Sequence, residues 1–198
     1  ADPSIREDEL AETLDYRCTR IAVYGDEHYA AQFASIVECI VRNMNQFHLP
    51  ESHPLHLKVV MSLDYGDKFI GVATYCVNRD PYPTPYGRIA NKGEEFIMRE
   101  IKRLIDDECV DLIVVGVPYL LDGKTTPQTQ KVVDFTQRLT ASISLPIQTQ
   151  DETLSTYEAE SRMKNSPQYN FQVDYSQIDA VAASVILEDF IRATASNS

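Results

Sequence analysis

The sequence predicts an α/β domain whose mixed sheet carries helices on both faces, together with an amino-terminal strand–helix extension. Two apolar runs at 58–64 and 69–77 follow each other after a short break, which is typical of a strand pair. Segments with helical spacing then alternate with short apolar runs. The run at 110–118 is apolar at nearly every position, as in a parallel strand covered on both faces. Strands followed by alternating helices and strands indicate a mixed sheet.

The predicted strand pair is followed by a proline-rich segment at 78–87, NRDPYPTPYG. This segment cannot form a central strand, because proline donates no backbone hydrogen bond. A short third strand is expected at 88–91. The next helix, at 94–108, places these apolar side chains on one face: Ile97, Met98, Ile101, Leu104 and Ile105.

The buried strand at 110–118 is followed by four further elements. They are a helix at 127–143, a strand at 145–152, and two helices at roughly 155–165 and 177–194. The alternation gives the domain helices for both faces of its sheet.

Residues 1–57 are predicted to form an extension outside the main domain, which spans 58–194. The extension comprises a short acidic segment at 1–16, a strand at 19–25, an amphipathic helix from Tyr29 and a proline-containing linker at 48–56. One strand and one helix do not bury their own apolar faces. We therefore expect the extension to pack on the main domain, on a protein partner or on a second copy of the chain.

The composition excludes some classes of protein. The formal net charge of −12 argues against a broad basic face for duplex nucleic acid, but it suits carboxylates that bind cations. No apolar run approaches the roughly 18 residues of a membrane helix, and the first residues fit neither a signal peptide nor a transit peptide. The four cysteines are scattered without a CxxC pair, which favours reduced, buried thiols. We expect a cytoplasmic protein that does not bind membranes.

Acidic residues stand where predicted elements begin or end. Asp64 ends the strand at 58–64, whereas Asp151 and Glu152 end the strand at 145–152. Asp179 lies in the first turn of the last helix and is expected to point inward. It shares a helix face with the residues expected to pack on the sheet: Ala182, Ala183, Ile186 and Phe190.

These acidic residues also have a structural interpretation: Asp64 suits a turn, and two serine–acid pairs match helix capping boxes. The pairs are Ser155 with Glu158 and Ser176 with Asp179. Their conjunction at the ends of neighbouring elements favours a site instead. Inward carboxylates are costly to bury without compensation, which Mg²⁺ or Mn²⁺ supplies. Two such ions activate water and stabilise the leaving oxygen in phosphodiester hydrolysis.

Four sequence blocks resemble those of the YqgF/RuvX family, in the family's order and at matching separations. They are LDYGDKFIGVA at 63–73, IVVGVPYLLDGKTTPQ at 113–128, DETLST at 151–156 and IDAVAASVILEDFI at 178–191. Each block alone is weak, whereas the four together are specific. The resemblance implies an RNase H-like fold of the type found in RuvC-type resolvases.

The resemblance also implies a nuclease that depends on Mg²⁺ or Mn²⁺ and processes ribosomal RNA precursors of the pre-16S type. On this basis Asp64, Glu152 and Asp179 are the expected metal ligands and catalytic residues, and Asp151 is a further catalytic candidate. The expected contacts to nucleic acid come from Lys68, Gly116, Lys124 and Gln128.

The chain departs from the family pattern at places that bear on the substrate, and the basic residues usual just before the last aspartate are absent from FQVDYSQI at 171–178. Phe69 and Thr153 stand where the family usually has arginine, and Thr126 stands where it often has glycine. The changes remove positive charge or loop flexibility beside the expected groove, where phosphate contacts usually set affinity. Two alternatives therefore stay open. One is a catalytically weak or inactive RNase H-like scaffold in a transcription or RNA-processing complex. The other is a Holliday junction resolvase.

Overall fold

The structure is a computed structural model of the chain and describes residues 47–119, 125–152 and 155–196. These residues belong to one compact unit, Phe47–Ser198. The strand at 19–25 and the helix from Tyr29 that the sequence predicts lie outside the described residues, so the expected partner of the extension remains a prediction. None of the described helices is long and apolar enough to cross a membrane.

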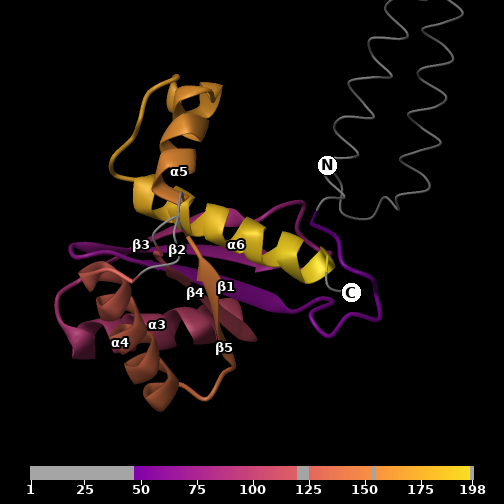
Figure 1. The fold of residues 1–198 in the computed structure, drawn as a ribbon. Coiled ribbons are helices and arrows are strands. Elements are labelled where there is room, and N and C mark those ends of the chain that lie inside the picture. The colour runs from indigo at the N-terminus through magenta and orange to yellow at the C-terminus, as the bar shows by residue number, and fades with distance from the viewer. Residues whose placement is uncertain (1–46, 120–124, 153–154, 197–198) are drawn as a thin grey trace, which may run out of the picture. The chain divides into compact units, whose positions relative to one another are not determined.

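Five strands form one mixed sheet in the order β3-β2-β1-β4-β5 (Figure 1). The strands are β1 (Val59–Tyr65), β2 (Phe69–Cys76), β3 (Thr84–Ala90), β4 (Leu112–Val117) and β5 (Ile147–Asp151). The pairs β1–β2 and β2–β3 are antiparallel, whereas β1–β4 and β4–β5 are parallel. The carboxyl ends of β1, β4 and β5 therefore meet at one edge of the sheet, where sites gather in α/β folds.

Helices cover both faces of this sheet. The helices α3 (Glu94–Glu108) and α4 (Pro127–Ser142) lie on one face, and α6 (Ile178–Ser196) crosses the other, as Figure 1 shows. The helix α5 (Ser155–Lys164) packs on α6, rises away from the sheet and leads into the 3-10 turn η1 (Pro167–Tyr169). The predicted fold class, an RNase H-like mixed sheet with helices on both faces, is confirmed.

The alternation of side chains along β1 sets which residues face α6. Met61 and Leu63 join the apolar core on the α3 and α4 face, whereas Val60 joins the core beneath α6. Ser62 also faces α6, because its hydroxyl donates a hydrogen bond to the Ala183 carbonyl at 2.7 Å. Successive strand residues point to opposite faces, so Asp64 lies on the α6 face as well.

The strand β3 is longer than the sequence predicts, and it begins at Thr84 rather than near Arg88. Its exposure alternates along its length, as expected for the outermost strand of a sheet. The pairing with β2 is irregular between Val72 and Ala73, close to Pro85. An edge position and a bulge are the two settings in which a strand accepts proline, so the proline-rich sequence does pair, but only at the edge.

The segment before β1 is anchored to the domain by specific contacts. Phe47 and Leu49 are buried in the core beneath α6. The Tyr75 hydroxyl donates to the Phe47 carbonyl at 3.0 Å, and the Asn78 side chain accepts from the Leu49 amide and donates to its carbonyl. The sequence suggests a solvated linker here, whereas the first part of the segment is packed. The domain boundary near residue 57 remains a prediction.

The two cysteines within the described residues are free thiols. Cys76 is buried, in agreement with the expectation for these thiols. Cys109 is exposed and ends α3 in the left-handed conformation, so the prediction of burial is wrong for it. Its backbone amide closes the helix by donating to the Ile105 carbonyl.

Candidate active site

Asp64 lies inside β1 rather than in the turn that follows. It pairs with Gly71 of β2 and faces α6. The turn begins after Tyr65, where the Gly66 amide donates to the Phe69 carbonyl at 3.0 Å. A side chain at Gly66 would crowd that carbonyl, which explains the glycine. The turn interpretation of Asp64 is therefore wrong, and the carboxylate is held by the central strand of the sheet.

A glycine stands on each side of Asp64. Gly71 is its partner on β2, and Gly116 follows Val115, which pairs with Leu63 on the parallel side. A Cβ at Gly71 would overlap the Asp179 carbonyl, and a Cβ at Gly116 would overlap the Glu152 carboxylate. The two glycines therefore open the sheet surface beside Asp64 for the two other predicted acidic residues.

Glu152 is the first residue after β5. Its amide donates to the Val117 carbonyl at 3.2 Å, which fixes the backbone at the carboxyl edge of the sheet. Its side chain turns back over Gly116 and lies near Ile186 of α6. One carboxylate oxygen, Oε2, is buried without a hydrogen-bond partner. Buried polar atoms in native proteins are nearly always paired, so this oxygen indicates a missing ligand or proton.

The carboxyl groups of Asp64 and Glu152 lie within hydrogen-bonding range of each other. Burial raises the pKa of both groups above their ordinary values. The charge of Asp179 raises the pKa of Asp64 further, and the charge of Asp64 does the same to Glu152. Two neighbouring like charges that are partly withdrawn from water do not both ionise readily, so the pair retains a proton near neutral pH.

Asp179 enters from the start of α6, where its backbone rests on Gly71. Its side chain is 30% exposed and lies 3.6 Å from Arg88 of β3. Ser176 and Asp179 do not form the predicted capping box, because the Ser176 hydroxyl donates a hydrogen bond to the Asp174 carboxylate instead. Asp64, Glu152 and Asp179 therefore come together from a central strand, the end of an edge strand and the last described helix.

The other predicted site residues have different surroundings. Asp151 is exposed and lines, with Glu152, a cavity of about 280 Å³ between β5, α5 and α6. Lys68 is exposed in the turn after β1. The Gln128 amide donates to the Tyr65 carbonyl at 3.1 Å, so it links α4 to the end of β1. Lys124 lies outside the described residues. The roles of these side chains in catalysis or nucleic-acid binding remain predictions.

The donor set of the three carboxylates suits Mg²⁺ or Mn²⁺, which prefer oxygen ligands. The unpaired Oε2 of Glu152 and the absence of a lysine or arginine paired with Asp64 or Glu152, in the part of the chain that the structure describes, fit a cation-binding role. In the same part, no group of three His, Cys, Asp or Glu side chains is already arranged around a metal position. Asp179 leans toward Arg88, so ligation by all three requires it to change partner.

A second buried glutamate lies nearby but is fully compensated. Glu188 of α6 is 9% exposed and accepts two hydrogen bonds from Arg162 of α5, at 2.5 and 2.9 Å. Arg192 donates to the same carboxylate at 3.1 Å. This cluster attaches α5 to α6 and leaves the Glu188 oxygens paired.

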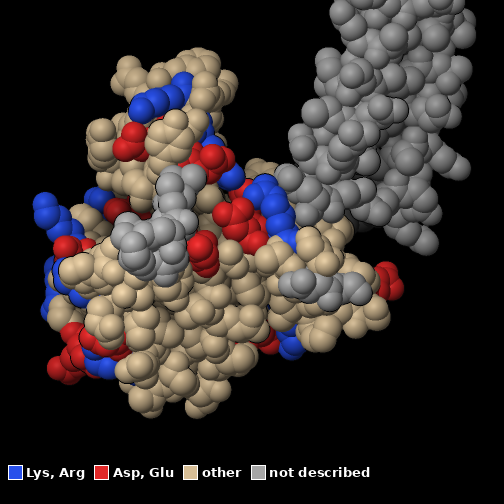
Figure 2. Space-filling model, viewed as in Figure 1, with Lys and Arg blue, Asp and Glu red and all other residues tan. Residues whose placement is uncertain are grey.

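Lysine and arginine side chains form small groups interspersed with acidic ones on the face shown in Figure 2, without a continuous basic surface among the coloured residues. Among the described residues, Arg88 forms an ion pair with one of the three carboxylates, that of Asp179. Arg88 is not among the residues that the sequence motifs indicate. Its position opposite Gly71 on β3 follows from the strand register, which the sequence alone does not fix.

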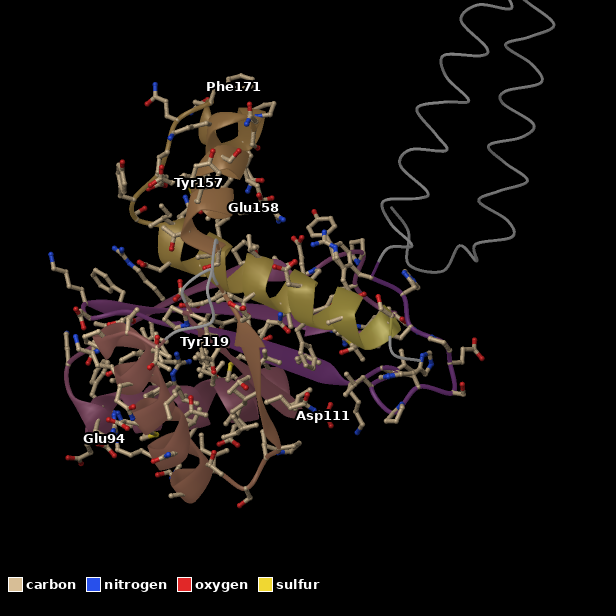
Figure 3. The ribbon with its side chains drawn as sticks, in the orientation of Figure 1. Glu94, Asp111, Tyr119, Tyr157, Glu158 and Phe171 are labelled. Carbon is tan, nitrogen blue, oxygen red and sulfur yellow. The ribbon has the colours of Figure 1, made fainter. Side chains whose placement is uncertain are left out.

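Exposed aromatic side chains are also present around this region. Figure 3 places Tyr157 and Phe171 on the arm that α5 forms above α6, and Tyr119 just after β4. Tyr157 is 73% exposed and Phe171 is 61% exposed. No sequence motif indicates these aromatic residues, because an isolated aromatic residue is more often part of a core. Exposed rings of this kind are surfaces on which unpaired bases stack.

Comparisons with known proteins give a consistent assignment. A family model described as "RuvX: Holliday junction resolvase" matches residues 58–193. A protein of Halothermothrix orenii, provisionally named a pre-16S rRNA nuclease, is 38% identical over 67% of this chain and 93% of its own length. A Chloroflexus aurantiacus protein with the same provisional name is 32% identical over 71% of this chain and 90% of its own.

Solved structures similar to this chain include RuvC of Thermus thermophilus. The similarity has a TM-score of 0.46 and 10% identity, and it covers 69% of this chain and 97% of that one. The same protein in complex with a Holliday junction substrate gives a TM-score of 0.45 and 11% identity, over 69% of this chain and 95% of that one.

Proposed function

Because this chain belongs to the RuvX family, we propose that it is a divalent-metal-dependent nuclease that hydrolyses phosphodiester bonds in RNA, with a ribosomal RNA precursor of the pre-16S type as substrate. The relatives' provisional name supplies the substrate class. The observation that carries the proposal is the half-buried Asp64–Glu152 pair, which has a buried oxygen without a hydrogen-bond partner and adjoins Asp179.

Asp64, Glu152 and Asp179 would hold Mg²⁺ or Mn²⁺ in this proposal. Bound ions of this type lower the pKa of a water molecule and stabilise the charge that develops on the leaving oxygen. The chain itself contributes position: Asp64 is fixed in the central strand, and Glu152 is fixed by its backbone bond to β4. The Glu152 carboxylate and the Ile186 side chain both lie over Gly116, where the absence of a Cβ leaves room for them.

The chain also controls a proton at this site. The raised pKa values mean that Asp64 and Glu152 keep a proton near neutral pH in the absence of a cation. Carboxylates bind metal ions in their ionised form, so binding must release that proton. The affinity for Mg²⁺ or Mn²⁺ is therefore expected to rise with pH through the neutral range.

Cleavage of a labelled pre-16S-type RNA by the purified full chain, with Mn²⁺ and with a chelator, tests the proposal. We expect metal-dependent cleavage that Asp64→Asn reduces by roughly 1,000-fold or more, the scale for the loss of one essential catalytic group. Asp107→Asn is the matched control. It makes the same chemical change at an exposed position of α3, where Asp107 forms a surface ion pair with Arg103.

The same assay distinguishes the alternatives when a four-way DNA junction is included as a second substrate. Cleavage of the junction but not of the RNA would assign a resolvase activity. If neither substrate is cut, and calorimetry shows no Mn²⁺ binding, the chain is a scaffold and the proposal is wrong. Equal RNA cleavage by Asp64→Asn and by the unaltered chain would also contradict it.

A further inference from the structure

Arg88 lies in line with Asp64 across the sheet. Asp64 pairs with Gly71, and Gly71 pairs with Arg88, so the three residues form a row over β1, β2 and β3. Directly opposed residues of antiparallel strands project to the same face, and here that face carries α6. Two strand spacings separate the backbones of Asp64 and Arg88, or about 10 Å. A long arginine side chain spans much of that distance.

The guanidinium of Arg88 is held by an aromatic ring. Its Cζ lies 3.8 Å from the centroid of the Phe69 ring, a close cation–π contact. Such contacts are modestly stabilising at exposed sites and stronger where water is excluded. Stacking uses the flat face of the guanidinium and leaves its N–H groups available at the edge. Phe69 therefore fixes the position of the charge without using its hydrogen-bonding capacity.

The polar partners of Arg88 are weakly held. Its Nη1 lies 3.6 Å from the Asp179 carboxylate and 3.4 Å from the Tyr175 carbonyl. Both side chains of the ion pair are about one-third exposed, at 31% and 30%. Pairs of this kind contribute at most about 1 kcal/mol to stability. The short two-fold contact of Arg162 with Glu188 shows how this protein builds a structural ion pair, and Arg88 is not held in that way.

We propose that Arg88 binds a backbone phosphate of the RNA beside the bond that is cleaved, with Phe69 as the platform that positions it; this rests on the proposed nuclease function. Phosphate oxygens form shorter and stronger bonds to guanidinium than the present partners do. When Arg88 turns its edge to a phosphate, Asp179 loses its ion-pair partner and is available as a ligand. Substrate binding and completion of the carboxylate set are then coupled through one residue.

Binding of a fluorescently labelled pre-16S-type RNA to the full chain carrying Asp64→Asn tests this inference, since that protein does not consume the probe. Affinity is measured at salt concentrations from roughly 50 to 200 mM with Mg²⁺ present. Arg88→Gln and Phe69→Leu are added singly. Arg99→Gln is the matched control, because Arg99 also stacks on a phenylalanine, Phe96, but on α3 across the sheet.

We expect Arg88→Gln to weaken binding by about 10-fold or more, the effect of losing one charged hydrogen bond. The slope of log affinity against log salt should fall by about 0.7–0.9, the value for one phosphate contact. Phe69→Leu should weaken binding less and keep the slope, because the charge remains but is less well positioned. Arg99→Gln should change neither quantity.

The outcomes separate this inference from the proposed function. If Arg88→Gln and Arg99→Gln give the same affinity and slope while RNA binding and metal-dependent cleavage persist, the inference is wrong and the nuclease function stands. If the chain neither binds nor cleaves RNA, both are wrong. Melting temperatures identify a folding defect: a shift of Arg88→Gln by more than about 4 °C, about 1 kcal/mol or more, would contradict the weak structural role assigned to its ion pair.

Discussion

Two glutamates close to α6 differ in whether their carboxylate oxygens are paired. Glu188 has its carboxylate oxygens paired with Arg162 and Arg192. Glu152 is half-buried, but its buried oxygen has no partner and its neighbour Asp64 carries the same charge. Burial of a carboxylate is costly unless it is paired. The protein compensates the first glutamate with its own cations and leaves the second for a proton or a bound cation.

The contrast gives a way to separate structural acids from functional ones in this molecule. Removal of a structural acid should destabilise the protein, because its arginines lose the partner that they share. Neutralising an acid that is kept for a ligand should instead stabilise the protein, since burial of that acid opposes folding until the ligand binds. The two residues carry the same charge and both lie close to α6, so it is their partners that distinguish them.

The largest expected effect is on the compensated glutamate. Glu188→Ala leaves Arg162 and Arg192 without their shared partner, and we expect a loss of about 3 kcal/mol in the free energy of unfolding. The melting temperature should fall by about 6–12 °C. Thermal denaturation measures this fall in melting temperature. Glu160→Ala is the control, because its pair with Lys164 is on the surface of α5 and is worth under about 1 kcal/mol. Equal shifts for the two variants would remove the contrast.

A smaller loss is expected at the glycine that makes room for Glu152. In Gly116→Ala, the new Cβ overlaps the Glu152 carboxylate and approaches Ile186 Cδ1 to 2.5 Å. Crowding of this type costs about 1–3 kcal/mol, and it should also reduce Mn²⁺ binding, as measured by calorimetry. Gly87→Ala on β3 is the control, because nothing lies within 4 Å of the added Cβ. Unchanged Mn²⁺ binding in Gly116→Ala would place the metal site elsewhere.

The smallest effect, and the one of opposite sign, is expected for Glu152→Gln. The raised pKa values mean that the folded chain holds more protons than the unfolded chain between the ordinary carboxyl pKa and the raised one. The metal-free protein should therefore lose stability as pH rises from about 5 to 8. Glu152→Gln should lessen this loss and raise the melting temperature at pH 8 by about 2–5 °C.

Differential scanning calorimetry at several pH values, with and without Mn²⁺, checks this prediction. Mn²⁺ should stabilise the unaltered chain, because a ligand that binds the folded state raises its stability. The same ion should stabilise Glu152→Gln much less. A variant that is less stable than the unaltered chain at pH 8 without metal would show that Glu152 is structural, as Glu188 is.

Much of the fold follows from the sequence because its signals are local. Apolar periodicity predicts every helix and central strand of the described domain to within a few residues. The start of β3 could not be predicted from the sequence, because prolines generally oppose strand pairing. Only the edge position and the bulge beside Pro85 allow this segment to pair. The burial of Phe47 also depends on a distant contact, with Tyr75.

The proximity of the three carboxylates could be anticipated from strand ends and a helix face, and the resemblance gave them roles. The hydrogen-bond and ion-pair partners of these carboxylates could not be anticipated. The partnerless oxygen of Glu152 depends on how closely the side chain packs on Gly116, and the pairing of Asp179 depends on the register of β3. Arg88 lies far along the chain from both Asp64 and Asp179, so only the paired strands show that it is their neighbour.

The packing of α6 on Gly71 links the assembly of the three carboxylates to the order in which the chain is synthesised. Asp64 emerges with the first described strand, whereas Asp179 arrives with the last described helix. Because Asp179 reaches Asp64 only when the start of α6 packs on Gly71, a nascent chain that stops before this helix has an incomplete set of carboxylates. The predicted set of carboxylates is therefore complete only after the last described helix has packed on the sheet.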